Sequence, residues 1–194
     1  MRRTTMLVIC ALVLAFGIGY VLAATVPKPL PDTLKVDYFA NAHTAGAPDA
    51  TLRLDNPGEA GGSVCANIYV FDGNQELSEC CSCYLSPDGL RTLSVNTDLT
   101  SNPLTGMTLN SGVLMMVSNV ATDTVCPLAT AMQPVTGGVR GWATHFQNAG
   151  FALTETTSQD ATMNVAEEAR LNAECNSVRL DGTGTGVCTC GTGD

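Results

Sequence analysis

Apolar and polar residues alternate along several short stretches of this 194-residue chain, a pattern typical of β-strands. The first stretch is 34–40, where Leu34, Val36, Tyr38 and Ala40 alternate with Lys35, Asp37 and Phe39. This predicts a strand that buries the face of Leu34 and Val36. Further strands are expected at 50–55, 64–71, 90–99, 140–148 and 150–156. The apolar run 112–118 has no polar alternation, which predicts a strand covered on both faces.

A hairpin is expected in the middle of the chain, around Asp72-Gly73, and a second turn at Ser86-Pro87-Asp88-Gly89. With Asp72 and Gly73 as the loop, Cys65 lies opposite Cys80. With Gly73-Asn74 as the loop, Cys65 lies opposite Ser82, on the same face as Cys80. In both registers Cys81 and Cys83 project from the other face, because side chains alternate along a strand.

One helix is expected late in the chain, at about 164–175. Asn164 is a good N-cap, and Glu167 completes a capping arrangement three residues later. Val165, Ala169 and Ala173 form the predicted buried stripe. The tail that follows, from Asp181 to the last cysteine, is rich in glycine and cannot hold a shape alone.

The N-terminus reads as an export signal, which places the folded domain outside the cytoplasm. Arg2 and Arg3 precede an apolar run at 6–24 that ends in small residues, which favours a cleaved signal peptide over 1–24. An uncleaved membrane anchor is the alternative, since the run could just span a bilayer. A proline-rich leader at 25–33 and a single domain at 34–194 follow.

Nine cysteines are present, and loss of Cys10 with the signal peptide leaves an even number. An even number of cysteines in an exported chain predicts a disulfide framework without free thiols. The candidates are Cys65, Cys80, Cys81, Cys83, Cys126, Cys175, Cys188 and Cys190. The favoured pairing is Cys65 with Cys80, and Cys126 is a candidate partner through which Cys175 could tie the helix to the sheet. The one-residue spacing of Cys188 and Cys190 matches that of Cys81 and Cys83.

These features together predict a mainly β domain. We expect an antiparallel β-sandwich or barrel stapled by disulfides, with one helix near the C-terminus.

The charge balance argues against some partners. The chain carries nine Lys and Arg against 18 Asp and Glu, and without Arg2 and Arg3 the net charge is −11. Such an acidic surface disfavours nucleic acid and anionic membranes as partners of the mature form.

Catalytic and metal-binding signatures are weak. The spacing of the cysteine clusters is not that of zinc sites, and Cys80-Cys81-Ser82-Cys83 lacks the helix N-terminus of a redox motif. His145 is more readily a strand residue than a catalytic base, because no G-x-S-x-G motif accompanies it. Asp181-Gly-Thr-Gly-Thr-Gly lacks the following helix of a phosphate loop. No catalytic residue, metal or cofactor is therefore assigned.

Three functions remain open. The first is a non-enzymatic secreted or cell-surface structural protein that self-associates with other copies, in filaments or a matrix, through its N-terminal strand. The alternative for that strand is pairing within its own domain. The second is a module that binds a glycan or surface partner, with Trp142 and His145 as possible contacts. The third and weaker one is a secreted hydrolase that uses His145 with a nearby acid. For glycoside hydrolysis, which needs paired carboxylates, Glu76, Glu79 and Glu155 are conceivable acids.

Several blocks of the sequence resemble a group of uncharacterised exported bacterial proteins that contain cysteines. The blocks are Glu79-Cys-Cys-Ser-Cys, 94–105, Trp142-Ala-Thr-His and Gly186-Val-Cys-Thr-Cys-Gly. The resemblance supports export and implies no activity, because none is assigned to the group.

Overall fold

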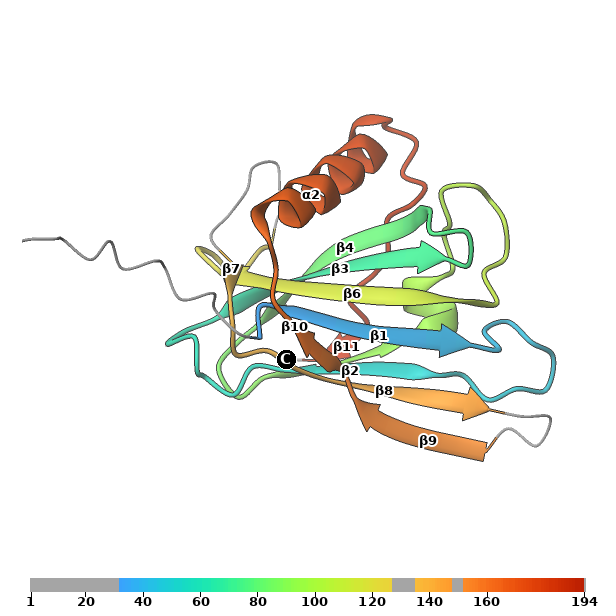
Figure 1. The fold of residues 1–194 in the computed structure, drawn as a ribbon, viewed down its shortest axis with the longest axis horizontal. Helices are drawn as coiled ribbons and strands as arrows, with labels where there is room; N and C mark the ends of the chain where they lie inside the picture. The colour runs from blue at the N-terminus through green and yellow to red at the C-terminus, as the bar shows by residue number, and fades with distance from the viewer. Residues whose placement is uncertain (1–31, 127–134, 148–151, 194) are drawn as a thin grey trace, which may run out of the picture.

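Two antiparallel β-sheets face each other, and one helix covers the outside of one sheet (Figure 1). This computed structural model describes residues 32–126, 135–147 and 152–193. The predicted signal peptide and most of the proline-rich leader lie outside the described residues. The two sheets, the single C-terminal helix and four disulfides confirm the predicted disulfide-stapled β-sandwich.

Sheet A has the strand order β10-β1-β6-β3-β4, with β7 against β6. Its strands are β1 (Leu34–Ala40), β3 (Val64–Asp72), β4 (Leu77–Leu85), β6 (Ser111–Val120), β7 (Val135–Thr136) and β10 (Gln159–Ala161). Sheet B has the order β11-β5-β2-β8-β9. Its strands are β2 (Thr51–Asp55), β5 (Leu90–Ser94), β8 (Arg140–Gln147), β9 (Ala152–Thr157) and β11 (Thr192–Gly193).

The main core lies between the sheets and is built from alternate residues of the facing strands. Its fully buried members include Leu52, Leu54, Ile68, Leu85, Leu93, Leu114 and Met116. Burial of each such side chain contributes about 1.5–3 kcal/mol. A second apolar cluster, which includes Tyr69, Phe71, Cys80 and Val117, lies between sheet A and the helix. The strand β3 is buried along almost all of its length, because both of these clusters contact it.

The predicted buried face of β1 is wrong in part. Lys35, Asp37 and Phe39 point into the sandwich and are all buried, whereas Tyr38 is 44% exposed. Leu34 does pack, but against the cluster under the helix. Two charges can lie inside because each meets a partner from a distant segment, and the apolar pattern of the strand itself does not reveal such partners.

The hairpin between β3 and β4 has a longer loop than predicted and a bulge between Val70 and Phe71, so the register is different. Cys65 lies opposite Tyr84, and Tyr69 lies opposite Cys80. The carboxylate Oδ1 of Asp72 accepts the backbone N–H groups of Asn74 (2.8 Å) and Glu76 (3.0 Å), which stabilises a four-residue loop at 73–76. The predicted faces are nevertheless confirmed, because Cys81 and Cys83 join the main core and Cys80 the cluster under the helix.

The strand expected at 90–99 ends early, at Ser94. Val95–Leu99 instead forms a single π-helical turn, η1. The Ser94 hydroxyl accepts the Thr97 N–H (2.8 Å), and the Asp98 carboxylate accepts the Ser94 N–H (2.7 Å). Such local side-chain bonds compete with the ladder and end the strand.

The helix, α2 (Val165–Leu180), begins as predicted and continues five residues beyond the expected end. The Asn164 carboxamide accepts the Glu167 N–H at 2.9 Å, which confirms the cap. The predicted buried stripe is wrong, because Val165 is 71% exposed and the buried residues are Leu171, Cys175 and Val178. The longer helix turns its larger apolar side chains toward sheet A.

Candidate functional site

His145 lies in a buried polar cluster between β1 of sheet A and β8 of sheet B. Its Nε2 is 2.9 Å from Thr156 Oγ1 and 3.2 Å from Asp37 Oδ1. The Ser158 hydroxyl donates to the other carboxylate oxygen of Asp37 at 2.9 Å. Tyr38 stacks on the imidazole, with 4.0 Å between ring centroids. The four polar side chains come from β1, β8, β9 and the corner before β10.

The chain makes room for this cluster at Gly141. Gly141 lies on β8, and a Cβ atom there would be 2.6 Å from Ser158 Oγ. Ser158 also donates its backbone N–H to the Gly141 carbonyl at 2.9 Å. The missing side chain therefore lets the β9–β10 corner close over Asp37.

The order of these contacts differs from that of a Ser-His-Asp hydrolase. In such enzymes the serine hydroxyl is bonded to the histidine, which takes its proton. Here Ser158 is bonded to the acid, and the Nδ1 of His145 has no partner among the described residues. His145 and Ser158 are 2% and 8% exposed. The cluster satisfies buried polar groups and joins the two sheets, and it presents no nucleophile to solvent.

Trp142 does not share a concavity with His145. It is three residues earlier on β8, so the alternation of the strand places its side chain on the opposite face of sheet B. There it is half-buried, beside Arg53 of β2 and Thr157 of β9. The two predicted ligand contacts are therefore separated by the sheet itself.

The eight predicted cysteines form four disulfides, three of which begin on β4. They join Cys65 to Cys126, Cys80 to Cys175, Cys81 to Cys188 and Cys83 to Cys190. The matched spacing of the last two pairs is confirmed. The favoured Cys65–Cys80 bridge and the candidate Cys126–Cys175 bridge are wrong, because the longer loop and the bulge in the hairpin place Cys65 opposite Tyr84 and away from Cys80.

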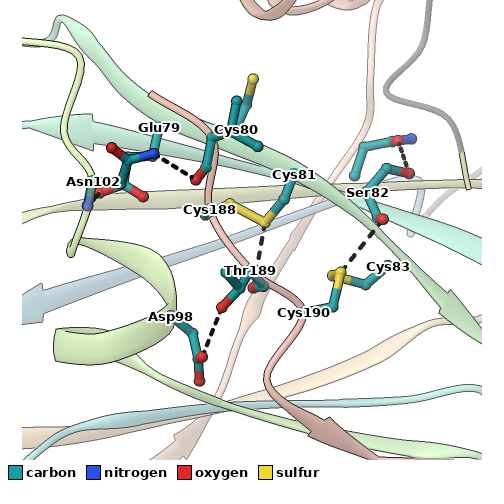
Figure 2. Close-up of a disulfide and its surroundings, with 12 residues drawn as sticks. Glu79, Cys80, Cys81, Ser82, Cys83, Asp98, Asn102, Cys188, Thr189 and Cys190 are labelled. Carbon is teal, nitrogen blue, oxygen red and sulfur yellow. Dashed lines mark hydrogen bonds between the residues drawn. A yellow bond between two sulfur atoms is a disulfide. The ribbon is translucent and has the colours of Figure 1, made fainter. Parts of the chain in front are cut away.

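The adjacent residues Cys80 and Cys81 point to opposite faces of β4. Cys80 forms a disulfide with Cys175 of α2 on the outer face of sheet A, and Cys81 forms one with Cys188 of the C-terminal tail on the inner face. Figure 2 shows the tail beside β4, with Cys188 and Cys190 turned toward Cys81 and Cys83. One strand therefore fastens two later segments of the chain.

The tail can approach β4 closely because of its glycines. Gly186 has a φ of +77°, and a Cβ there would be 2.6 Å from Val178 of α2. Its N–H donates to the Asn102 carbonyl at 2.7 Å, and its carbonyl accepts the Cys80 N–H at 2.8 Å. The glycine-rich tail, which was not expected to hold a shape alone, is therefore ordered by backbone contacts as well as by its disulfides.

Glu79, next to these cysteines, is fully buried at the edge of sheet A. Its Oε1 accepts the Asn102 N–H at 2.8 Å, and its Oε2 has no partner among the described residues. Burial raises the pKa of Glu79 to about 7, and the Asn102 N–H opposes this rise. Sequence reasoning gave Glu79 no structural role. The signal available was a carboxylate in a strand beside three cysteines.

The other carboxylates considered for hydrolysis do not join Glu79. Glu155 lies on β9, at the edge of sheet B away from β4, and is ion-paired with Arg53. Glu76 lies in the loop before β4. These positions do not form the paired acids that glycoside hydrolysis needs.

A cavity of about 290 Å³ lies on the outer face of sheet A, beside α2. Phe71, Val113, Met115 and Arg170 line it, together with two residues of the β3–β4 hairpin. The Arg170 guanidinium lies 5.3 Å from the centroid of the Phe71 ring and is ion-paired with Glu167 and Glu174. Neither His145 nor Trp142 lines this cavity.

Searches of the described residues for two other kinds of site find nothing. Within 32–126, 135–147 and 152–193, no three His, Cys, Asp or Glu side chains are arranged to hold a metal ion. In the same part of the chain, no helix has the length and apolar character needed to cross a membrane.

Comparisons with known proteins find no relative. No family model, curated protein or solved structure matches this chain. The resemblance to exported bacterial proteins therefore stays an expectation based on the sequence blocks.

Proposed function

We propose that this chain is a secreted or cell-surface structural protein that has no enzymatic activity and associates with other copies of itself. The observation that carries the proposal is the covalent fastening of α2 and the tail to the two faces of β4. Disulfides form and persist in oxidising compartments, and four of them in one small domain indicate such a compartment. A domain closed in this way suits a role that requires durability outside the cell.

Self-association through the N-terminal strand has little support. In the structure β1 pairs with β6 over all seven of its residues and with β10 over three. It also carries Asp37 of the buried cluster and Lys35, which is ion-paired with Asp32 and Asp160. Release of this strand would leave those charges unpaired, so we place self-association elsewhere on the molecule.

The polar cluster supports the non-enzymatic part of the proposal. Its only serine donates to Asp37, and both His145 and Asp37 are buried. A broad hydrolase screen of the native protein and of a His145→Ala variant tests this point. We expect no turnover from either protein, whereas turnover that depends on His145 would contradict the proposal.

Export and association are tested on the protein secreted under its own leader. Alkylation and mass spectrometry should find no free thiol among residues 65–190, and sedimentation with electron microscopy should find ordered oligomers at high protein concentration. Free thiols or stoichiometric zinc would contradict the disulfide-locked form. A strict monomer at high concentration would contradict self-association.

A second function, binding of a glycan or surface partner, is favoured by the position of Trp142. The indole is half-buried on the outer face of sheet B, beside Arg53, where a sugar ring could stack on it. A glycan array with the native protein, Trp142→Phe and Trp142→Ala tests this function. Binding that persists in the Phe variant and is lost in the Ala variant would support it, and binding unchanged in the Ala variant would exclude it.

A further inference from the structure

The edges of the two sheets differ in how well they are covered. On β4, the Cys80 N–H donates to the Gly186 carbonyl at 2.8 Å, and the Cys80 carbonyl accepts the Cys188 N–H at 3.2 Å. Ser78 accepts the Leu104 N–H at 2.9 Å, and the Arg91 side chain donates to the Tyr84 carbonyl at 3.1 Å. The tail, a loop and an arginine thus occupy this edge.

Two further edges are too short to recruit another strand. Sheet A ends at β10, which has three residues, and sheet B ends on one side at β11, which has two. Short edge strands are one of the ways in which natural proteins avoid pairing with other chains.

The edge at β9 has no such protection from the part of the chain that the structure describes. This strand pairs with β8 over six residues, and no other described residue pairs with it. Figure 1 shows it as the outermost strand at the lower margin of the molecule. Leu153 is 61% exposed, and every residue from Thr154 to Thr157 is exposed as well. The strand has no lysine, proline or bulge, and threonine favours extended structure.

Charge does not keep a second copy away from this edge, although the chain as a whole is acidic. The only carboxylate on β9 is that of Glu155, and it is ion-paired with Arg53 of β2, which lies on the far side of β8. The rest of the strand is uncharged. A second copy of an acidic protein therefore meets less repulsion here than the net charge of −11 expected without Arg2 and Arg3 would suggest.

We propose that two copies of this chain join edge to edge at β9, in an antiparallel pair across a twofold axis. The unpaired N–H and C=O groups of an edge strand are satisfied by another strand, and an isologous pair satisfies both copies at once. The inference rests on the proposed self-association and names its interface. Because the pair uses up the open edge of both copies, the assembly is a closed dimer.

The register of the pair follows from backbone parity and charge. In an antiparallel pair, a residue whose N–H and C=O point toward the partner strand lies opposite a residue whose groups also point across. Such residues alternate along β9, so in a twofold pair the axis must pass through a residue that lies opposite its own copy. An axis at Glu155 would oppose two carboxylates, and an axis at Leu153 would pair fewer residues. An axis at Thr154 pairs the threonine with itself and keeps the two Glu155 side chains apart.

The first test measures mass against concentration by sedimentation for the purified secreted protein. Stable complexes bury about 1,200–2,000 Å², and a six-residue edge is a small interface. We therefore expect a weight-average mass that doubles only at high concentration. Thr154→Lys should abolish the doubling, because two ammonium groups would meet at the axis. Thr162→Lys, an exposed threonine after β10, should retain it.

The second test traps the register with one added thiol. Residues directly opposite each other in an antiparallel pair lie about 4.5–5.5 Å apart between Cα atoms, within the range that a disulfide can bridge. We expect Thr154→Cys to cross-link into a dimer at least tenfold faster than Thr157→Cys, which lies several residues from the axis. Equal cross-linking rates would contradict the register.

The outcomes separate this interface from the proposed function. A native protein that stays monomeric at every concentration would overturn both. Dimers that survive Thr154→Lys would overturn the β9 interface and leave self-association standing. Filaments in place of dimers would overturn the closed twofold pair.

Discussion

The two sides of this sandwich are stabilised by different chemistry. Around β4, covalent bonds attach α2 through Cys80 and the tail through Cys81 and Cys83. Where β1 meets β8, no disulfide is present among the described residues, and the cluster of Asp37 and His145 joins the sheets instead. The difference follows from what each segment can bury.

The tail depends on disulfides because it has few side chains that could pack in a core. Residues 182–191 include four glycines and offer few side chains to a core, so its backbone entropy must be offset by cross-links. The strands β1 and β8 lie within sheets and already have ladder hydrogen bonds. For them, a few buried polar contacts are enough to fix the relative position of the two sheets.

The largest expected effect comes from removing both bridges between β4 and the tail. Each closes a loop with a sequence separation of 107, for which the chain-entropy account gives about 4–5 kcal/mol. The two loops are nearly the same, so the second bridge adds little once the first has formed. The four-cysteine variant with Ala at 81, 83, 188 and 190 should lose about 4–5 kcal/mol in denaturant unfolding.

The matched control keeps one of these two bridges. We expect the Cys83→Ala/Cys190→Ala pair to lose no more than about 1–2 kcal/mol, because the Cys81–Cys188 bridge still closes the loop. A two-cysteine variant that loses as much as the four-cysteine variant would contradict this expectation, because the remaining Cys81–Cys188 bridge would then contribute nothing.

The next effect is on the other side of the molecule. Asp37→Ala removes the acceptor of the Ser158 hydroxyl and the acid beside His145. A buried network that loses one partner leaves the others unsatisfied, so we expect a loss of about 3 kcal/mol in thermal or denaturant unfolding. Asp123→Ala, at an exposed carboxylate, should stay within about 0.5 kcal/mol. Equal losses of unfolding free energy in the two variants would contradict a stabilising role for the cluster of Asp37 and His145.

A smaller effect, of the order of 2 kcal/mol, is expected from the pH dependence of Glu79. Its folded-state pKa is about 7, above its ordinary value of 4.5, so the folded protein holds this proton more tightly than the unfolded chain. The stabilisation from this group is complete below about pH 4.5 and is lost as the pH rises through 7. Glu79→Gln keeps an acceptor for the Asn102 N–H but has no proton to lose. The unfolding free energy of this variant should therefore fall less between pH 5 and 8 than that of the native protein. A decline as steep as that of the native protein would contradict the assignment.

The smallest effect is expected at Val165, on the exposed side of α2, and the buried Leu171 provides the contrast. Val165 is 71% exposed, and Leu171 is fully buried. Val165→Ala should therefore change the unfolding free energy by less than about 0.5 kcal/mol, and Leu171→Ala should cost about 2–5 kcal/mol. The reverse order of these two values would indicate that the face predicted from the sequence is the buried one.

Local patterns were sufficient to predict most of the longer strands, the Asn164 cap and the pairing of two Cys-x-Cys segments, but not the short strands β7, β10 and β11 or the early end of β5 at Ser94. Alternation, capping and spacing are properties of short stretches, and the structure preserves them. The residues opposite Cys65 and Cys80 depend on the length of the loop that the Asp72 carboxylate stabilises and on the bulge between Val70 and Phe71. A two-residue turn signal does not contain that information.

The buried charges of β1 were also beyond prediction. Lys35 and Asp37 lie inside because Asp160 and His145, more than a hundred residues away in the sequence, come to meet them. Of the residues in the candidate site, only His145 was named from the sequence. Its partners, its order of hydrogen bonds and its separation from Trp142 depend on how the two sheets are aligned, which no short stretch of sequence specifies.

The most direct test of the account is the disulfide connectivity of the secreted protein. Cys80 and Cys81 are adjacent, so proteolysis must be followed by fragmentation in the mass spectrometer to separate them. The account predicts that Cys80 is joined to Cys175 of the helix, and Cys81 to Cys188 of the tail. The exchanged pairs, Cys80 with Cys188 and Cys81 with Cys175, would contradict it, because they would require the helix and the tail to lie on the other faces of β4.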